Sequence, residues 1–490
     1  MHALKKTMVL VLSLLALIAS DIFAQNAGDA LRLSEPGLAS NARALGMGNA
    51  YTALSDDFSA SSFNPAGFAL IKRMEFAGGM FYSKFNNSTS LSGSGADYSG
   101  GVKTNYSNST TKLDNLSFAF PFPTLRGSLV FAIGYNKDKD FNGAVNFNGY
   151  NSGNTSMIQS LLGPRDLPYY LYLTDSTGDN TPINGKLNQD GTTLSKGSIG
   201  KWAFSGASEV APNVFVGATL NVYSGDYSRT RDYYEEDTKN VYRNIQTDPG
   251  DITTRGFRLF YFNDILNWDI SGWDANIGFL YQMNKYREYG LRIGGNIKFP
   301  AHYIIKENYT VTGRSEFADG QVISLNNPFE SSSEYDILTP YIFSCGAAFN
   351  YKGAVVSAGI SYIDYTGMEF TGGLSSMLMA LNNKDIKEQF RGVVNYNLGA
   401  EYTIPEIDLR VRAGFMMNPS PYISDQNVSD YDKKYITGGL GFLADESFAF
   451  DIAYAYGWWK DIGDNYGVNV SRTNQDIKSR NMIFTVTYRF

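Results

Sequence analysis

Histidine and cysteine, which often supply general bases, nucleophiles and metal ligands, are nearly absent from this sequence. The 490 residues contain two histidines and one cysteine, Cys345. His2 lies in a segment that we expect to be cleaved, which leaves His302 and excludes haem ligation by two histidines of one chain. A single histidine gives poor support for a hydrolase, and no carboxylate pair, metal-ligand cluster or phosphate-binding loop is found. We therefore expect no enzymatic activity, no cofactor and no metal.

Charged residues occur on otherwise small-residue faces of later segments and in the acidic pair Asp56-Asp57. They could contact the carboxylate of a ligand, but such charges more often pair with one another. We expect pairing, with Asp56 and Asp57 as partners of the charges inside the fold. The candidates are Arg292, Lys298, Glu401, Asp408, Arg410, Arg412 and Asp451, of which Arg410, Arg412 and Asp451 are singled out.

The first 24 residues resemble a secretory signal peptide: Lys5 and Lys6 precede an apolar run from Met8 to Ala19, and Ala24 is a plausible cleavage point. No other run of 18 or more apolar residues follows, so a helical membrane protein is excluded. The mature chain has no disulfide framework. Its net charge is −7 and no basic cluster appears along the sequence, which argues against nucleic acid as a partner.

From residue 73 onward the sequence alternates with period two. In the last segment Met482, Phe484, Val486, Tyr488 and Phe490 form one face, and small or polar residues form the other. A soluble sandwich also alternates, but a continuous apolar face with aromatic residues at the strand ends is typical of transmembrane β-strands. Fourteen such segments are found, at 73–85, 112–122, 126–137, 198–210, 213–228, 267–282, 287–300, 337–351, 353–366, 390–403, 407–418, 433–444, 447–458 and 478–490.

The connections between these segments alternate between short and long. Short ones fall around 123–125, 211–212, 284–286, 352, 405–406 and 445–446, and long ones at 86–111, 138–197, 229–266, 301–336, 367–389, 419–432 and 459–477. In outer-membrane barrels short turns face the periplasm and long loops face outside. The sequence thus predicts an all-β, 14-stranded antiparallel transmembrane barrel over residues 73–490, in the outer membrane of a Gram-negative cell, with both termini periplasmic. We expect a monomer surrounded by outer-membrane lipid.

Residues 25–72 do not fit the barrel pattern. From Ser40 to Ala69 small residues dominate, Gly46 and Gly48 interrupt any long helix, and Pro65 and Gly67 favour a turn. Because a lumen inside fourteen strands is too wide for side chains to fill, this segment is expected to be a plug, or hatch, inside it.

The same segment resembles the FadL/TodX-type outer-membrane transporters of hydrophobic compounds. The resemblance rests on the run Asn41–Ala50, the pair Asp56-Asp57 and the turn Asn64-Pro65-Ala66-Gly67; the acidic pair follows Ser55, a small departure from the family pattern. It implies passive transport of a hydrophobic small molecule, such as a long-chain fatty acid or hydrocarbon, by capture in the loops, binding in the lumen and lateral release into the membrane, with residues 64–67 as the hatch turn. A scaffold for surface-protein export on the same fold stays open as an alternative.

Apolar stretches between the predicted strands are candidate capture surfaces. Phe257, Phe260 and Phe262 lie in one, Met377, Met379 and Leu381 in a short predicted helix of another, and residues 158–170 contain a third. These residues could equally pack on one another to cap the barrel. Glycines in early strands are candidates for a lateral opening because they are flexible, namely Gly78, Gly79 and Gly134.

Overall fold

The structure, a computed structural model, describes residues 25–98, 103–247, 254–286, 289–423, 428–444 and 447–490. The predicted signal peptide and the predicted turn at 445–446 lie outside these ranges. None of the described helices is long and apolar enough to cross a membrane.

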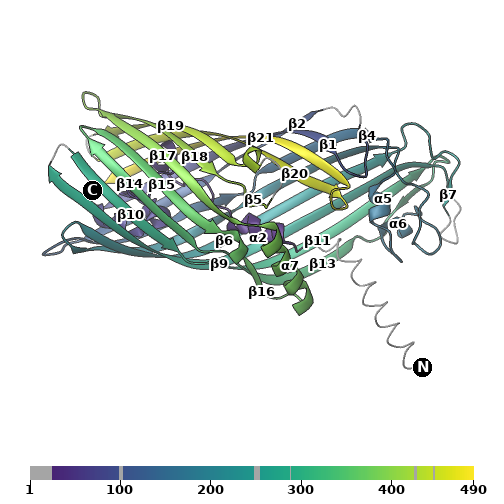
Figure 1. The fold of residues 1–490 in the computed structure, drawn as a ribbon, viewed down its shortest axis with the longest axis horizontal. Helices are drawn as coiled ribbons and strands as arrows, with labels where there is room; N and C mark the ends of the chain where they lie inside the picture. The colour runs from purple at the N-terminus through teal and green to yellow at the C-terminus, as the bar shows by residue number, and fades with distance from the viewer. Residues whose placement is uncertain (1–24, 99–102, 248–253, 287–288, 424–427, 445–446) are drawn as a thin grey trace, which may run out of the picture.

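A ring of fourteen antiparallel strands forms a closed barrel, as predicted (Figure 1). Neighbouring strands follow one another in chain order, and β21 pairs with β1 over the whole of β1, from Glu75 opposite Arg489 to Ser92 opposite Arg472. The ring consists of β1 (Glu75–Ser92), β2 (Thr104–Phe122), β3 (Leu129–Asp140), β5 (Leu187–Ala211), β6 (Val214–Glu236), β9 (Phe257–Tyr286), β10 (Tyr289–Lys298), β14 (Ile342–Tyr351), β15 (Ala354–Asp364), β17 (Gly392–Ile404), β18 (Leu409–Asn418), β19 (Lys433–Ala444), β20 (Phe448–Tyr466) and β21 (Ser471–Arg489).

Several strands continue far beyond the ring, at the end of the barrel opposite the C-terminus (Figure 1). The additional elements are β4 (Gly143–Asn151), α5 (Met157–Ser160), α6 (Leu167–Tyr170), β7 (Gln246–Thr247), β8 (Thr254–Arg255), β11 (His302–Phe317), β12 (Val322–Ser324), β13 (Phe329–Leu338), η3 (Tyr365–Gly367), β16 (Glu369–Gly372), α7 (Ser376–Gln389) and η4 (Val428–Asp430). β11 continues β10 after a break at residues 299–301, and β13 leads into β14 after a break at 339–341.

The prediction of long loops at 229–266 and 301–336 was therefore wrong for much of both stretches. β6 and β9 extend into the first, and β11, β12 and β13 occupy most of the second. The physical reason is a reversal of the pattern. In β11 the inward Tyr303, Ile305 and Tyr309 are buried and the outward Lys306 and Asn308 are exposed, whereas in the membrane the outward face is the apolar one.

The N-terminal segment lies among the barrel strands as short helices: α2 (Ala27–Ser34), α3 (Ala42–Gly46), α4 (Ala60–Phe63) and η2 (Pro65–Leu70). Side-chain caps define where the first two of these helices begin. Asn26 caps α2 together with Asp29, and Asn41 caps α3. Two apolar clusters join this segment to the wall; one holds Leu45, Met47 and Tyr51 against Phe81, and the other holds Phe68 against Leu280. We refer to residues 25–72 as the hatch.

Candidate functional site

The wall that faces the hatch is built from glycines. Glycine pairs with glycine across neighbouring strands at 217 and 278, at 294 and 346, at 346 and 359, and at 399 and 414. At Gly217, Gly278, Gly294, Gly399 and Gly414 an added Cβ would lie nearer than 3.0 Å to hatch atoms. The hatch backbone therefore rests directly on the backbone of the wall.

Asn64, at the hatch turn, is fully buried and joins the hatch to β9. Its side-chain Nδ2 donates to the carbonyl oxygens of Thr52 and Phe279, both at 2.9 Å, while its Oδ1 accepts from the amide of Ala66 at 3.2 Å. Pro65 occupies the first position of η2, where its missing N–H costs nothing, and the residue after it, Ala66, is also buried. An added Cβ at Gly67 would clash with the backbone of Ser55, so the turn packs tightly on the hatch itself.

A continuous chain of ion pairs crosses the lumen from β10 through the hatch to β20. Asp56 contacts Arg292 at 3.1 Å and Arg43 at 2.6 Å, and Arg43 in turn contacts Glu401 at 3.0 Å. Arg412 continues the chain, with Nε 2.6 Å from Glu401 and Nη1 2.5 Å from Asp451. Four of the charges anticipated inside the fold, Arg292, Glu401, Arg412 and Asp451, thus take part in one network. The network holds the hatch directly to β10 and β17, and β18 and β20 continue it.

The other predicted hatch and lumen residues take different places. Asp57 accepts from the hydroxyl of Tyr51 at 2.7 Å and forms no ion pair among the described residues. Gly46 and Gly48 lie against β19 and β18, and Gly48 has a φ of 60°. Arg410 is half-buried near the start of β18, opposite Thr403 and Gly441.

Two cavities lie in the lumen above the hatch. One of about 330 Å³ has the aromatic walls Phe81, Phe85, Phe141, Tyr227, Tyr435 and Trp459. Four cationic residues line it, Arg32, Lys137, Lys139 and Lys433, against two acidic ones, Glu35 and Asp140. The second, of about 150 Å³, shares residues 36–38, Lys137 and Lys139 with the first and reaches the strand breaks at Ala301 and Pro340. Sequence reasoning missed these cavities, because their lining comes from strands far apart in the chain.

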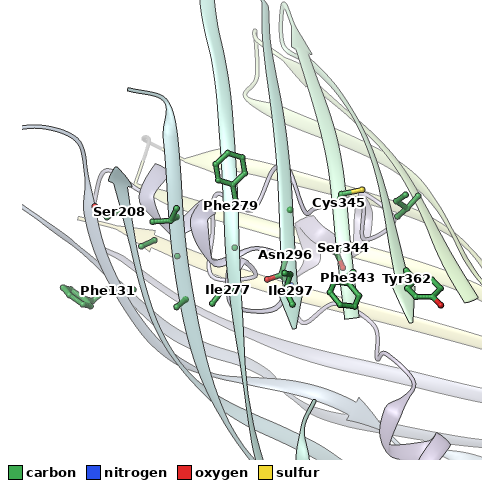
Figure 2. A pocket seen from close by; sticks show the side chains of 18 of the residues that line it. Phe131, Ser208, Ile277, Phe279, Asn296, Ile297, Phe343, Ser344, Cys345 and Tyr362 are labelled. Carbon is green, nitrogen blue, oxygen red and sulfur yellow. The ribbon is translucent and has the colours of Figure 1, made fainter. Parts of the chain in front are cut away.

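The outer surface of the barrel carries an apolar hollow of about 1010 Å³ (Figure 2). The strand register places its residues in one row around the barrel: Phe131, Gly206, Ala218, Ile277, Ile297, Phe343 and Tyr362. The lining includes the small residues Gly206 and Ala218. Phe131 and Tyr362 stand at the two sides of the hollow (Figure 2). Cys345 lies here too and is exposed on the membrane side.

The hollow lies directly behind the hatch turn. Gly217 and Gly278 line it from β6 and β9, and the same two glycines contact Pro65 and Asn64 on their inner side. Asn296 and Ser344, which face each other on β10 and β14, line both the hollow and the smaller luminal cavity. The wall between lumen and membrane is therefore a single backbone layer with small side chains at this place.

The predicted capture residues divide into two groups. Phe257, Phe260 and Phe262 belong to β9 and not to a loop, and all three are buried in the apolar core of the extracellular half. Met377 and Leu381, in contrast, are exposed on α7, as expected for a short helix in this loop, and Met379 packs partly on the core. Of the third stretch, Ile158 and Leu167 are buried in the same core.

A buried polar cluster holds the extracellular end together. Glu235, fully buried near the end of β6, accepts from the amide of Met157 at 2.8 Å, from Gln189 Nε2 at 2.7 Å and from the hydroxyl of Tyr233 at 3.0 Å. Burial raises the pKa of this carboxyl to about 7. Sequence analysis did not identify this cluster, because its members lie on three separate elements, α5, β5 and β6.

The comparisons with known proteins agree with this architecture. Residues 206–490 match the family described as outer membrane protein transport protein (OMPP1/FadL/TodX). The toluene transporter TodX of Pseudomonas putida has a similar structure, with a TM-score of 0.52, 12% identity, and coverage of 93% of this chain and 99% of that one. A FadL homologue of Pseudomonas aeruginosa has a TM-score of 0.52, 11% identity, and coverage of 93% and 98%. No curated protein matches the chain.

The barrel, its inner hatch and the family match define the class: an outer-membrane transport channel, not an enzyme. The chain belongs to the FadL/TodX family of outer-membrane transporters of hydrophobic compounds.

Proposed function

We propose that this channel passively transports molecules that combine an apolar chain with an anionic head, such as long-chain fatty acids. The observation that carries the proposal is the larger luminal cavity, where aromatic side chains from β1, β19 and β20 surround cationic ones. Aromatic surface offers apolar contact at roughly 25 cal/mol per Å² buried. Three of the four cations already pair with carboxylates, so Lys139, which forms no ion pair with a described residue, is the one placed to meet a ligand carboxylate. TodX of Pseudomonas putida is a transporter of toluene, which is an apolar molecule as well.

Entry takes place beside α7. The first turns of this helix expose Met377 and Leu381, and its second half reaches the start of the hatch, where Asn382 Nδ2 donates to the Gln25 carbonyl at 3.1 Å. A ligand held on these exposed side chains is therefore next to the segment that leads to the luminal cavities.

Release takes place sideways through the wall between β10 and β14. Only the layer that contains Asn296 and Ser344 separates the smaller luminal cavity from the outer hollow there. The hollow is apolar and open to the membrane, so an acyl chain that leaves the lumen would stay out of water throughout. Gly78, Gly79 and Gly134 are less favoured because none of them lines the outer hollow or either luminal cavity. The register of β1 with β2 does shift between Gly79 and Met80, and Gly134 packs on the Phe58 ring.

The cavity is tested by ligand binding to the purified protein. We expect Trp459→Ser to weaken binding of a radiolabelled long-chain fatty acid about tenfold, because the ring supplies apolar area in the cavity. Trp273→Ser, on the outer face of β9 where the ring is 57% exposed, serves as the matched control and should bind as the unchanged protein does. Equal binding by all three proteins would contradict the luminal site.

The exit is tested by locking the wall. In a Cys345→Ala background, Asn296→Cys with Ser344→Cys places two thiols on directly opposed residues of β10 and β14. Oxidation should stop delivery of fatty acid into the lipid of proteoliposomes, and a reductant should restore it. The control is Thr437→Cys with Ala455→Cys, an opposed inward pair on β19 and β20. Undiminished delivery with the first pair fully oxidised would exclude release at this place.

A further inference from the structure

A groove of about 870 Å³ lies on the outer surface over β19, β20, β21 and the neighbouring parts of β1 and β2. It lies on the outer side of the wall and shares Trp459 with the larger luminal cavity. Five cationic residues line it: Lys103, Lys434, Lys460, Lys478 and Arg480. Because the chain as a whole has a net charge of −7, this local concentration of cations is unusual and indicates an anionic ligand.

The strand register places three of these cations, Lys434, Lys478 and Arg480, in two adjacent outward rows, and Lys84 of β1 lies next to the groove at the end of the second row. One row reads Lys434, Trp458 and Lys478 across β19, β20 and β21. The row below it reads Ile436, Tyr456, Arg480 and, on β1, Lys84. The sequence does not show this cluster, because each strand contributes one or two cations and none contributes a run.

Both rows lie at the outer edge of the membrane. Beneath them the outward residues are apolar or aromatic, with Tyr454 and Met482 followed by Ile452 and Phe484. From Phe448, at the periplasmic end of β20, to Trp458 the strand rises roughly 33 Å. At a tilt of 35–45° this corresponds to roughly 25 Å of height, which is the height of the apolar band of an outer-membrane barrel. The cations therefore face the head groups of the outer leaflet.

The acidic residues of the groove are already engaged. Asp476 pairs with Lys103 at 3.0 Å and Asp430 pairs with Lys460 at 2.7 Å. Asp432 is buried and accepts from the amide of Ser420 at 2.9 Å. Lys84, Lys478 and Arg480 form no ion pair with any described residue, so these three cations are available to an external anion.

The opposite wall has the reverse charge at the same level. Asp226 of β6 and Asp269 of β9 face each other there and both are exposed. On β11 and β13, Lys306 is offset by Glu334 at 3.7 Å. The outer rim is thus positive on one side and acidic on the other, and the cationic side is not a general property of the extracellular surface.

We propose that this groove binds the phosphate-bearing head group of a glycolipid of the outer leaflet, of the lipid A type. The acyl chains of this lipid lie on the apolar rows below. Tyr456 and Trp458, whose rings stack on each other at a centroid distance of 6.0 Å, lie at the level of the interface. Lys84, Lys478 and Arg480 contact the phosphate. Guanidinium and ammonium groups at a membrane surface attract anionic lipid, and each one adds to the affinity. This inference does not depend on the transported ligand.

The test uses the full mature protein in detergent, titrated with bisphosphorylated lipid A and with the same lipid after removal of both phosphates, followed by native mass spectrometry. The unchanged protein should bind the phosphorylated lipid at least about tenfold more tightly. Lys84→Gln/Lys478→Gln/Arg480→Gln should lose that preference. The control Lys196→Gln/Lys306→Gln/Lys384→Gln removes the same charge from exposed positions elsewhere and should keep it.

Two results would overturn the proposal: equal binding of both lipids by the unchanged protein, or full retention of the preference by the first triple variant. Folding is checked by the heat-dependent migration of the barrel in gels. If the triple variant does not fold, the comparison of the two lipids on the unchanged protein and on Lys478→Gln alone decides the question.

Discussion

At the scale of single residues, Arg412 is a buried cation on which the charge balance of the lumen depends. It is 3% exposed and lies between the carboxylates of Glu401 and Asp451. Removing one partner of a buried ion pair leaves an uncompensated charge, whereas the pair itself adds little over apolar packing. Arg412 is therefore required because its two partners are present, more than for any gain it supplies alone.

We expect Arg412→Gln to lower the free energy of unfolding by about 3–5 kcal/mol, because the buried Asp451 loses its cation and Glu401 keeps only Arg43. Arg410→Gln, two residues away on the same strand and half-buried, should cost less than about 1 kcal/mol. Urea unfolding followed by tryptophan fluorescence in detergent measures both. Equal loss in the two variants would mean that the ion pairs do not hold this part of the wall.

Glu235 gives the extracellular end a defined dependence on pH. It lies more than ten residues beyond Val222, the last exposed apolar residue of β6, so it is outside the membrane. Its pKa is about 7 in the folded protein against an ordinary 4.5, so the folded form binds a proton that the unfolded form has released. Stability of this end is therefore highest below about pH 4.5 and falls as pH rises towards 7, by on the order of 3 kcal/mol in total.

Hydrogen exchange of the α5 amides at pH 5 and pH 8, corrected for intrinsic rates, measures this effect. We expect weaker protection at pH 8 in the unchanged protein and a much smaller difference in Glu235→Gln, which cannot ionise. A pH dependence that persists undiminished in the variant would assign it to another group.

At the scale of elements, the contact between hatch and wall depends on glycine. An added Cβ at Gly399 would meet the backbone of Met47, and one at Gly414 the backbone of Gly48. At the outward Gly438, on β19, an added Cβ would have its nearest neighbour, the carbonyl oxygen of Arg412, at 3.7 Å. Strands of one sheet thus contain some glycines that have no room for a larger side chain and others that do, and the sequence alone does not distinguish them.

Gly399→Ala should displace the hatch or lower the yield of folded protein severalfold, because backbone atoms cannot move aside as a side-chain tip can. Gly438→Ala, facing lipid, should fold normally. Limited proteolysis of residues 40–70 in the two variants reports whether the hatch is released. Equal resistance would show that the wall can adjust to the added methyl group.

The sequence predicted the membrane part of each strand because lipid on one side and lumen on the other leave a strong alternation, as in Met482–Phe490. It failed above the membrane. There both surfaces follow the rules of soluble sheets, and Phe257–Leu266 was assigned to a loop although its alternate residues are buried in the core. The motif residues of the hatch were found locally, but the cavities, the outer hollow and the cationic groove depend on the register between strands, which one sequence does not specify.

At the scale of the whole molecule, the hatch lies inside a lumen that fourteen strands alone would leave open, and we propose that it closes this lumen. We expect the unchanged protein to give no large steady ion current in planar bilayers. Deletion of residues 40–70 should produce such a current, while deletion of 376–389, which removes α7 outside the ring, should not. A silent hatch deletion, in folded protein, would mean that the extracellular strands close the channel instead.

The seam of the barrel joins β1 to β21, and the bond from Arg489 Nε to Glu75 bridges 414 residues of chain. Neither edge can find its partner until the last residues have been made and exported. The polypeptide must therefore cross the periplasm with long unpaired, aromatic-rich strands, which is the state most exposed to aggregation. Its biogenesis consequently requires a holding chaperone, and a premature stop within β21 should lead to degradation of the whole protein and not to a smaller barrel.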